Sequence, residues 1–282
     1  MRDTSAFAVS SVNVNGIRAA FRNGMARWLE EEAPDVLLLQ EVRAEAEIAS
    51  ALLGEEWETH VYPSHIKGRA GVAVAVRRDS LTVALDTTSV PVHGLAEEED
   101  PVDSGRWLEV DLVTSAGQRI RVISAYFHAG RAGDPKQEAK MRHLARIDQR
   151  MRTLYGLAET ESIQTLLGGD FNVVRSEYDI KNWRPNHNKT SGVLDEEIAY
   201  LNRWVDLGWN DIVRSLTGEE HGPYSWWSRR GRAFDNNVGW RIDYHYLTPG
   251  LVEGASRIRV FRAPTWDTRF SDHAPVTLTY RV

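Results

Sequence analysis

Short apolar runs of strand length alternate along the chain with longer stretches in which apolar residues recur at helical spacing, and this alternation constrains the fold most. Several runs are too apolar to face water on either side, so they belong in sheets covered on both faces. The predicted strands are Phe7–Val14, Asp35–Gln40, Gly71–Arg77, Arg119–Phe127, Thr165–Gly169, Ile242–Leu247 and Ala274–Tyr280. The predicted helices are Ala20–Glu32, Glu45–Leu53, Lys136–Ala158 and Leu194–Leu207. We therefore expect an α/β fold in which helices flank two stacked sheets.

The composition is that of a chain that can build one large core. No sequence repeat or Pro/Ser-rich linker divides the 282 residues, of which 42% are hydrophobic, so we expect residues 1–282 to form a single domain. The sequence has no cysteine, which excludes disulfides, thiolate zinc sites and cysteine nucleophiles. The N-terminus lacks the apolar stretch of a signal peptide, and the longest apolar runs are strand-sized. We therefore expect a cytoplasmic protein that does not contact a membrane.

Two long segments, Asp86–Arg106 and Asp179–Ser191, fall outside the alternation. The first contains the acidic run Glu97–Asp100, which is interpreted as a solvated loop. The basic residues of the predicted helix Lys136–Ala158 are likewise interpreted as a solvated face. The net charge of -6 counts against binding a polyanion, so charge has to be considered region by region.

Polar residues follow or begin the predicted strands in five separate segments of the chain. They are Asn13 and Asn15, Gln40 and Glu41, Asp170 and Asn172, Asp243, and Asp272 with His273. Ligands of α/β domains gather at strand ends, so these segments can bring carboxylates, amides and one imidazole into a single cleft. Oxygen-rich ligation of this kind suits a hard cation such as Mg²⁺ or Mn²⁺, which keeps open positions for water and phosphate oxygens.

Each of these residues also has a purely structural explanation, because a lone Asp or Asn after a strand is more often a turn former or a helix cap. No single one is diagnostic, and only their number favours a site. Other chemistries have weaker support, because the sequence contains no GxxxxGK[ST] loop, GxSxG elbow, HExxH motif or EF-hand ligand run.

Six sequence blocks carry a resemblance to a known family and together span nearly the whole chain. They are NVNGIRAA (Asn13–Ala20), LQEVR (Leu39–Arg43), AYF (Ala125–Phe127), GGDFN (Gly168–Asn172), GWRIDYHYL (Gly239–Leu247) and SDHAPV (Ser271–Val276). In this order they resemble the signature blocks of the endonuclease/exonuclease/phosphatase superfamily, and the forms NVNGIRA and WRIDY are similar to its exonuclease III and abasic-site endonuclease branch. The resemblance implies a four-layer α/β sandwich of the DNase I type, with two packed mixed β-sheets flanked by helices.

The resemblance also implies a magnesium site, with manganese as a substitute. Glu41 is expected to be the principal ligand, supported by Asn13, and Asp272 is expected near the same ion. The full set of residues expected around the metal is Asn13, Glu41, Asp170, Asn172, Asp272 and His273.

Five matched positions are expected to act in catalysis. The resemblance implies that Asp170 positions or deprotonates the attacking water and that Asn172 donates a hydrogen bond to the transition state. His273, kept basic by Asp243, is expected to face the scissile phosphorus, and Tyr126 to contact the phosphate. Phosphodiester hydrolysis needs an aligned water, a base, and donors or positive charge where negative charge grows, and these residue types supply each.

One block departs from the family. Many relatives have Tyr-Val-Pro-Asn where this chain has Tyr126, Phe127, His128 and Ala129. The tyrosine is kept, but the asparagine that would contact a phosphate is lost. Either Arg131 or His128 replaces that contact, or binding at this point is weaker.

The substrate is indicated by aromatic and basic residues near the catalytic positions. Trp226 lies 17 residues before Asp243 (243 − 226), a spacing similar to that of the family's pocket aromatic. Trp226, Trp240 and Ile242 are expected to line an apolar slot that accepts a flipped, baseless sugar and excludes a normal nucleotide by size. The alternative is that these tryptophans belong to the core, since the chain contains ten.

Two basic loops are expected to form a local rim for DNA despite the global acidity. Their residues are Arg229, Arg230 and Arg232 in one loop, and Lys181, Arg184 and Lys189 in the other, which also contains His187.

These features predict a monomeric abasic-site endonuclease of exonuclease III type, with 3′-to-5′ exonuclease and 3′-phosphatase activity in base excision repair. Its expected partner is double-stranded DNA with abasic sites or 3′ ends. Two alternatives stay open: a phosphatase or phosphodiesterase acting on a small phosphoester, and a non-catalytic nucleic-acid-binding regulator.

Overall fold

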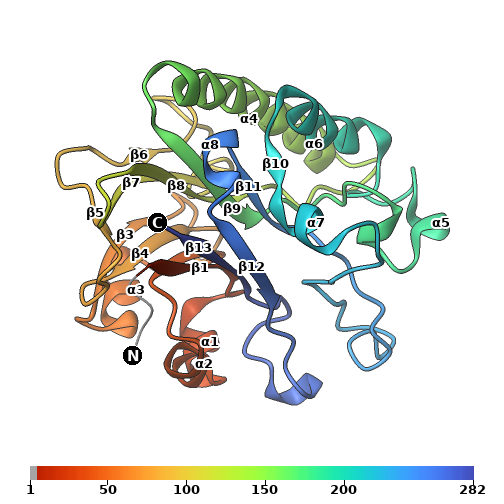
Figure 1. The fold of residues 1–282 in the computed structure, drawn as a ribbon. Helices are drawn as coiled ribbons and strands as arrows, with labels where there is room; N and C mark the ends of the chain where they lie inside the picture. The colour runs from red at the N-terminus through yellow and green to blue at the C-terminus, as the bar shows by residue number, and fades with distance from the viewer. Residues whose placement is uncertain (1–4) are drawn as a thin grey trace.

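Two β-sheets pack face to face, and helices cover the outer side of each (Figure 1). The computed structural model describes residues 5–282. The first sheet has the strand order β12 (Ala255–Val260), β13 (Val276–Arg281), β1 (Ala6–Asn13), β2 (Val36–Gln40), β4 (Val72–Arg77), β3 (Trp57–Tyr62). The second has the order β10 (Asn210–Asp211), β11 (Asp243–Leu247), β9 (Gln164–Asp170), β8 (Arg119–Tyr126), β7 (Trp107–Thr114), β5 (Val83–Leu85), with β6 (Val92–His93) paired to β7. Both sheets are mixed, because β1 runs parallel to β2 and β8 runs parallel to β9 among otherwise antiparallel pairs.

The helices form the two outer layers. The outer side of the first sheet carries α1 (Ile17–Arg22), α2 (Met25–Glu32) and α3 (Ala46–Leu53). The outer side of the second carries α4 (Pro135–Thr160) and α6 (Asp195–Leu207), which lie along the top of Figure 1. Shorter helices are α5 (Trp183–Asn186), α7 (Ile212–Thr217) and α8 (Pro249–Val252). The fold is thus the predicted four-layer α/β sandwich with two mixed sheets.

The apolar strand β2 shows why the layers stack in this way. Its residues point alternately to the two faces of the sheet. Val36 and Leu38 pack into the core between the sheets, whereas Leu37 and Leu39 pack under α1, α2 and α3. All are fully buried, and burying a side chain of this size contributes about 1.5–3 kcal/mol. A strand that is apolar on both sides therefore requires a covering layer on each.

Some secondary-structure predictions were incomplete or wrong. The single helix predicted at Ala20–Glu32 is two helices, α1 and α2, because Asn23 and Gly24 separate them and Gly24 has a φ of 108° in the left-handed region. Strands β3, β7 and β12 were not predicted, because the prediction relied mainly on continuous apolar runs and polar residues interrupt these three segments. In β7, for example, Glu109 and Asp111 are buried and pair with Arg121 of β8.

The acidic run Glu97–Asp100 and the basic face of α4, both interpreted as solvated, are only partly exposed to solvent. In the acidic run, Glu97 and Glu98 are exposed, but Glu99 accepts hydrogen bonds from the Tyr62 hydroxyl at 2.9 Å and from the Leu95 N–H at 2.6 Å. On α4 the prediction was wrong for Lys140, which is fully buried beside Glu197. Among residues 5–282, no helix is long and apolar enough to cross a membrane.

His245 makes the stability of the sandwich depend on pH. Its ring lies between the sheets, where Nε2 is 2.8 Å from the Val276 carbonyl oxygen, and burial lowers its pKa to about 4. Below about pH 6.5 the imidazole is therefore protonated in the unfolded chain but stays neutral in the folded chain. The free energy of unfolding consequently decreases as the pH is lowered from about 6.5 to about 4. We expect His245→Gln to reduce the stability lost between pH 7.5 and pH 5 by about 2 kcal/mol, measured by urea unfolding. Equal losses in the two proteins would contradict this assignment.

Candidate active site

The register of the strands brings the predicted catalytic residues into one row. Asp170 at the end of β9 is paired with Tyr126 of β8 on one side and with Asp243 of β11 on the other. Asn13, at the end of β1 in the other sheet, donates from Nδ2 to Asp170 Oδ2 at 2.8 Å. The same amide nitrogen donates to Glu41 Oε1 at 3.0 Å. One edge of the sandwich thus gathers these five side chains from both sheets.

The backbone at this edge adopts conformations that only specific residues allow. Asn15, Glu41 and Asn172 all have φ between 46° and 50°, in the left-handed region. Such residues cost free energy and persist where the surrounding structure holds them, often at functional sites. Gly169 is required for a different reason: a Cβ there would lie 1.9 Å from the Ala125 carbonyl oxygen, so β9 could not approach β8.

His273 lies buried between two carboxylates. Its Nδ1 is 2.8 Å from Asp243 Oδ2, and its Nε2 is 3.7 Å from Asp170 Oδ2. Burial opposes a charge on the ring, but the charges of Asp243 and Asp170 outweigh it and raise the pKa of His273 to about 10. The imidazole is therefore a cation at neutral pH.

Asp170 is the most perturbed carboxyl of the group. Burial raises its pKa, and the negative charge of Asp243 adds to this, while the positive charge of His273 and the hydrogen bond from Asn13 oppose it; the resulting pKa is about 7. A carboxylate with a pKa near neutrality can both accept and release a proton at physiological pH.

Two further predicted residues adjoin Asp170. Asn172 donates from Nδ2 to Asp170 Oδ2 at 3.2 Å and to the Phe127 carbonyl oxygen at 3.0 Å. Burial, together with the charges of Glu41 and Asp170, raises the pKa of the Tyr126 hydroxyl well above its usual value. Tyr126 therefore keeps its proton and can act as a hydrogen-bond donor.

The residues around Glu41 fit a hard cation. Glu41, Asp170 and the amide of Asn13 present oxygen donors within one hydrogen-bonded group, and a cation would relieve the repulsion between the two carboxylates. Asp272 is linked to this group through Asn15, whose Nδ2 donates to Asp272 Oδ1 at 2.7 Å and whose backbone N–H donates to Asn13 Oδ1 at 3.0 Å. This donor set is typical of Mg²⁺ or Mn²⁺ ligation.

An open pocket of about 450 Å³ adjoins Asn172. Trp226, Trp240 and Ile242 line one side of it, and the rings of the two tryptophans meet edge to face with centroids 5.6 Å apart. These tryptophans are partly exposed, whereas the neighbouring Trp227 is 1% exposed and belongs to the core. The structure thus brings the three residues of the predicted slot together beside the row of catalytic candidates.

The chain from Ala129 onward, at the end of the segment that departs from the family, also lines this pocket. Ala129 and Arg131 line it, together with Lys189 from the second basic loop. His128 does not line it, because its ring turns away to Asp103, with Nε2 2.7 Å from Asp103 Oδ1. Of the two residues considered as substitutes for the missing asparagine, only Arg131 faces the pocket.

The other predicted basic residues lie on the surface beyond Asp272. Arg229 and Arg232 line a hollow there, together with the exposed Trp266, whereas Arg230 is exposed on the same loop. In the second basic loop, Lys181 and Arg184 are exposed and His187 pairs with Asp195 at 2.6 Å.

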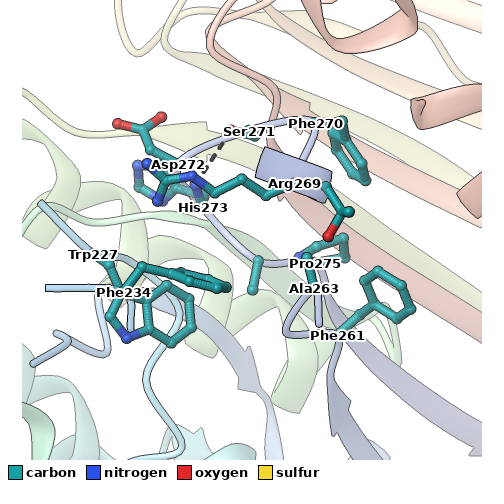
Figure 2. A pocket seen from close by; sticks show the side chains of 12 residues that line it. Trp227, Phe234, Phe261, Ala263, Arg269, Phe270, Ser271, Asp272, His273 and Pro275 are labelled. Carbon is teal, nitrogen blue, oxygen red and sulfur yellow. Dashed lines mark hydrogen bonds between the residues drawn. The ribbon is translucent and has the colours of Figure 1, made fainter. Parts of the chain in front are cut away.

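Arg269 is a basic residue near the site that the sequence did not reveal. Figure 2 shows it extending towards Asp272 and His273, beside the core rings of Trp227 and Phe234, whose centroids are 5.1 Å apart. It belongs to no sequence block, although it lies two residues before SDHAPV.

Other contributors were also missed. Arg43 pairs with Glu41, and the guanidinium carbon of Arg106 lies 4.7 Å from the centre of the Tyr126 ring. Arg43 lies inside the block LQEVR and could have been found there, whereas Arg106 lies in a long loop without a recognisable pattern.

Lys140 supports the site from behind. It donates from Nζ to the Asn172 carbonyl oxygen at 2.9 Å and pairs with the buried Glu197 at 2.8 Å. Glu197 in turn accepts a hydrogen bond from the Gly192 N–H at 2.5 Å. The pair therefore joins α4 and α6 to the loop that begins at Asn172.

The chain belongs to the Endonuclease/Exonuclease/phosphatase family, whose model matches residues 10–273. Membership makes it a hydrolase acting on phosphodiester bonds, in a superfamily that depends on a divalent metal ion. An exodeoxyribonuclease of Bacillus subtilis (strain 168) is 31% identical over 280 residues, which cover 96% of this chain and 98% of that protein. The DNA repair nuclease APEX1 of Danio rerio is 28% identical and covers 96% of this chain and 81% of its own length.

A solved structure gives the same assignment. The 3′-5′ exonuclease NExo from Neisseria meningitidis superposes with a TM-score of 0.80 at 27% identity, covering 98% of this chain and all of its own. The sequence resemblance to the exonuclease III and abasic-site endonuclease branch is thereby confirmed.

Because Lys140 and Glu197 form a buried ion pair, we predict that replacing Lys140 strongly lowers the stability of the fold. We expect Lys140→Met to lower the free energy of unfolding by about 3–5 kcal/mol, because it leaves the Glu197 carboxylate buried without its cation. Arg142→Met, an exposed change on the same helix, is the control and should stay within about 0.5 kcal/mol. Urea denaturation measures both, and equal effects would refute the role of the pair.

Proposed function

We propose that the chain is a Mg²⁺-dependent DNA phosphodiesterase of the exodeoxyribonuclease III type. In this proposal it acts in base excision repair as an abasic-site endonuclease, with 3′-to-5′ exonuclease and 3′-phosphatase activity. The observation that carries it is the buried group of Asp170, His273 and Asp243 beside a pocket with two tryptophans in its wall. The names of the relatives, an exodeoxyribonuclease and a DNA repair nuclease, support DNA as the substrate.

Asp170 is the base of the proposed reaction. With a pKa raised to about 7, it takes the proton of the attacking water while the water oxygen forms a bond to phosphorus. The bond between phosphorus and the leaving sugar oxygen breaks on the opposite side. Asn13 fixes the carboxylate for this task, because it donates to Asp170 Oδ2.

Cationic and neutral donors stabilise the negative charge that grows on the phosphate oxygens. The His273 imidazolium, held by Asp243, presents a buried positive charge, which is worth more there than in water. Asn172 and the protonated Tyr126 hydroxyl add neutral donors beside it. In this role His273 acts as a cation and not as a metal ligand.

Glu41, Asn13 and Asp272 are the residues proposed to hold the metal. When bound, Mg²⁺, or Mn²⁺ as a substitute, supplies Lewis-acid polarisation of a phosphate oxygen. The carboxylate and amide oxygens of these residues suit a hard cation. Asn13 donates to Glu41, and Asn15 links Asp272 to Asn13, so the three lie in one hydrogen-bonded group.

The pocket supports a preference for abasic sites. Trp226, Trp240 and Ile242 offer an apolar wall for a sugar without a base, and extrusion from the duplex costs least where no base is stacked. Arg131 and Lys189 in its wall, and Arg229 and Arg230 beyond it, offer contacts to the phosphate backbone. A non-catalytic regulator is less well supported, because it would not need this complete set of acid, cation and donor groups.

The same proposal includes a single domain and a monomer in the cytoplasm. A single domain is supported by the site itself, since Asn13 from one sheet and Asp170 from the other meet in it. A monomer is supported because one chain supplies every group assigned a role. The lack of cysteine is compatible with a reducing compartment.

Incision of a duplex with one abasic-site analogue tests the mechanism. We expect Mg²⁺-dependent cleavage that EDTA abolishes, and a fall in rate of about 10²-fold or more for Asp170→Asn and for His273→Ala. Arg142→Met serves as a control with full activity. Cleavage in EDTA, or undiminished cleavage by both variants, would overturn the proposal.

Trp240→Ala tests the slot separately from the chemistry. Removing this wall admits a normal nucleotide, so the ratio of abasic-site incision to digestion of an intact 3′ end should fall about tenfold or more. Both rates are measured on the same preparation, which makes the ratio independent of the active fraction. If both rates fell equally, the tryptophan would have a structural role only.

A further inference from the structure

A second cluster of side chains that could hold a metal ion includes one residue of the loop that follows β8. Asp103, His128 and His143 come from three segments: the loop before β7, the loop after β8, and helix α4. One carboxylate oxygen and one ring nitrogen from each histidine lie within 4.8 Å of one another. None of the three faces the aromatic pocket, and the proposed reaction uses none of them.

His143 is the unusual member of this cluster. It is 1% exposed, and within residues 5–282 neither of its ring nitrogens has a hydrogen-bond partner. A buried polar group without a partner costs about 1–3 kcal/mol, so an unpaired imidazole here calls for an unseen partner. Its ring meets that of His128 edge to face, with centroids 5.0 Å apart.

From this arrangement we propose that Asp103, His128 and His143 bind a transition-metal ion of the Zn²⁺ class. Two imidazole nitrogens and one carboxylate oxygen form a donor set that suits Zn²⁺ and leaves a fourth position for water. The same set is poor for Mg²⁺, which prefers oxygen ligands. The site therefore differs in chemistry from the oxygen-rich group around Glu41.

The geometry needs only a small adjustment. Ligand atoms about 2.0–2.2 Å from a tetrahedral zinc ion lie roughly 3–4 Å from one another. His128 Nε2 and Asp103 Oδ1, now 2.7 Å apart, would separate slightly, and the His143 ring would move towards them. The His128 side chain is 11% exposed, which leaves a path for the ion.

The electrostatics of the cluster are compatible with one divalent ion. Burial lowers the pKa of His128, and lowers that of His143 to about 3, so both rings are neutral and each has one nitrogen lone pair. For His128 Nε2 to bind the ion, the proton that it donates to Asp103 moves to Nδ1. Nearby positive charges oppose the ion: Arg146 pairs with Asp103 Oδ2 at 3.0 Å, and Arg106 and Lys140 lie further away. Arg146 is 42% exposed and can turn to solvent when the ion takes over its carboxylate.

The ion would fix the loop that forms one wall of the pocket. His128 lies between Phe127, whose carbonyl oxygen accepts a hydrogen bond from Asn172, and Ala129, which lines the pocket. Anchoring His128 to α4 through His143 therefore ties the pocket wall to the longest helix of the fold. The role assigned to the ion is structural.

The test uses the full chain, stripped with a chelator and dialysed, in excess Mg²⁺ so that the oxygen-rich group is saturated. Zn²⁺ should raise the melting midpoint by about 5 °C when its free concentration is 100 times the dissociation constant. Co²⁺ should bind with one equivalent and give the visible absorption of a site with nitrogen and oxygen ligands. Both signals should be lost in His143→Gln and in Asp103→Asn.

A matched control is His187→Gln. His187 and Asp195 form the same histidine–carboxylate contact, at 2.6 Å, but have no second histidine in the cluster. This variant, and Glu41→Gln in the oxygen-rich group, should keep the full response to Zn²⁺. No response in the wild type, or the same response in His143→Gln and Asp103→Asn as in the wild type, would overturn the proposal and assign any binding to adventitious surface sites. If one of these two variants fails to fold, the other decides the result.

Discussion

The hydrogen bonds of the Asn13 amide are the contact on which the site depends. Asn13 ends a strand of one sheet, Asp170 ends a strand of the other, and one nitrogen donates to both Asp170 and Glu41. The Asp170 and Glu41 carboxylates repel each other, and the shared amide donor offsets part of this repulsion. The face-to-face packing of the sheets therefore does more than bury apolar surface. It also places Asp170 and Glu41 close enough to share one hydrogen-bond donor, the Asn13 amide.

The buried charges of the site balance one another only as a group. His273 is cationic because Asp243 and Asp170 surround it, and Asp170 remains ionisable near neutrality because His273 offsets part of its burial. Without the two carboxylates, burial would lower the pKa of His273, and without His273 the pKa of Asp170 would rise further. A group of this kind can be maintained only in a rigid frame, which the register pairing of Asp170 with Asp243 provides.

The sequence predicted which residues gather at the candidate site better than it predicted the residues that support them. Asp170, Asp243 and His273 could be found because they stand at strand ends and inside recognisable blocks, and strand ends converge for geometric reasons. Lys140 could not, because a lysine on an amphipathic helix is usually exposed, and only the packing of α4 against α6 buries it beside Glu197. Strand β7 was missed for a related reason: its buried Glu109 and Asp111 are paired with Arg121 of β8 across the sheet, which no local pattern reveals.

The departure from the family at His128 and Ala129 changes two faces of one loop. On the inner face, Ala129 lines the pocket where the resemblance implies an asparagine that contacts a phosphate, and Arg131, a longer and charged side chain, lines the same pocket. On the outer face, His128 turns to Asp103 and towards His143. A proline at this position could make neither contact. The residue that replaces the family's asparagine in the pocket and the residue that contacts Asp103 are thus adjacent, so the position of the pocket wall depends on what holds His128.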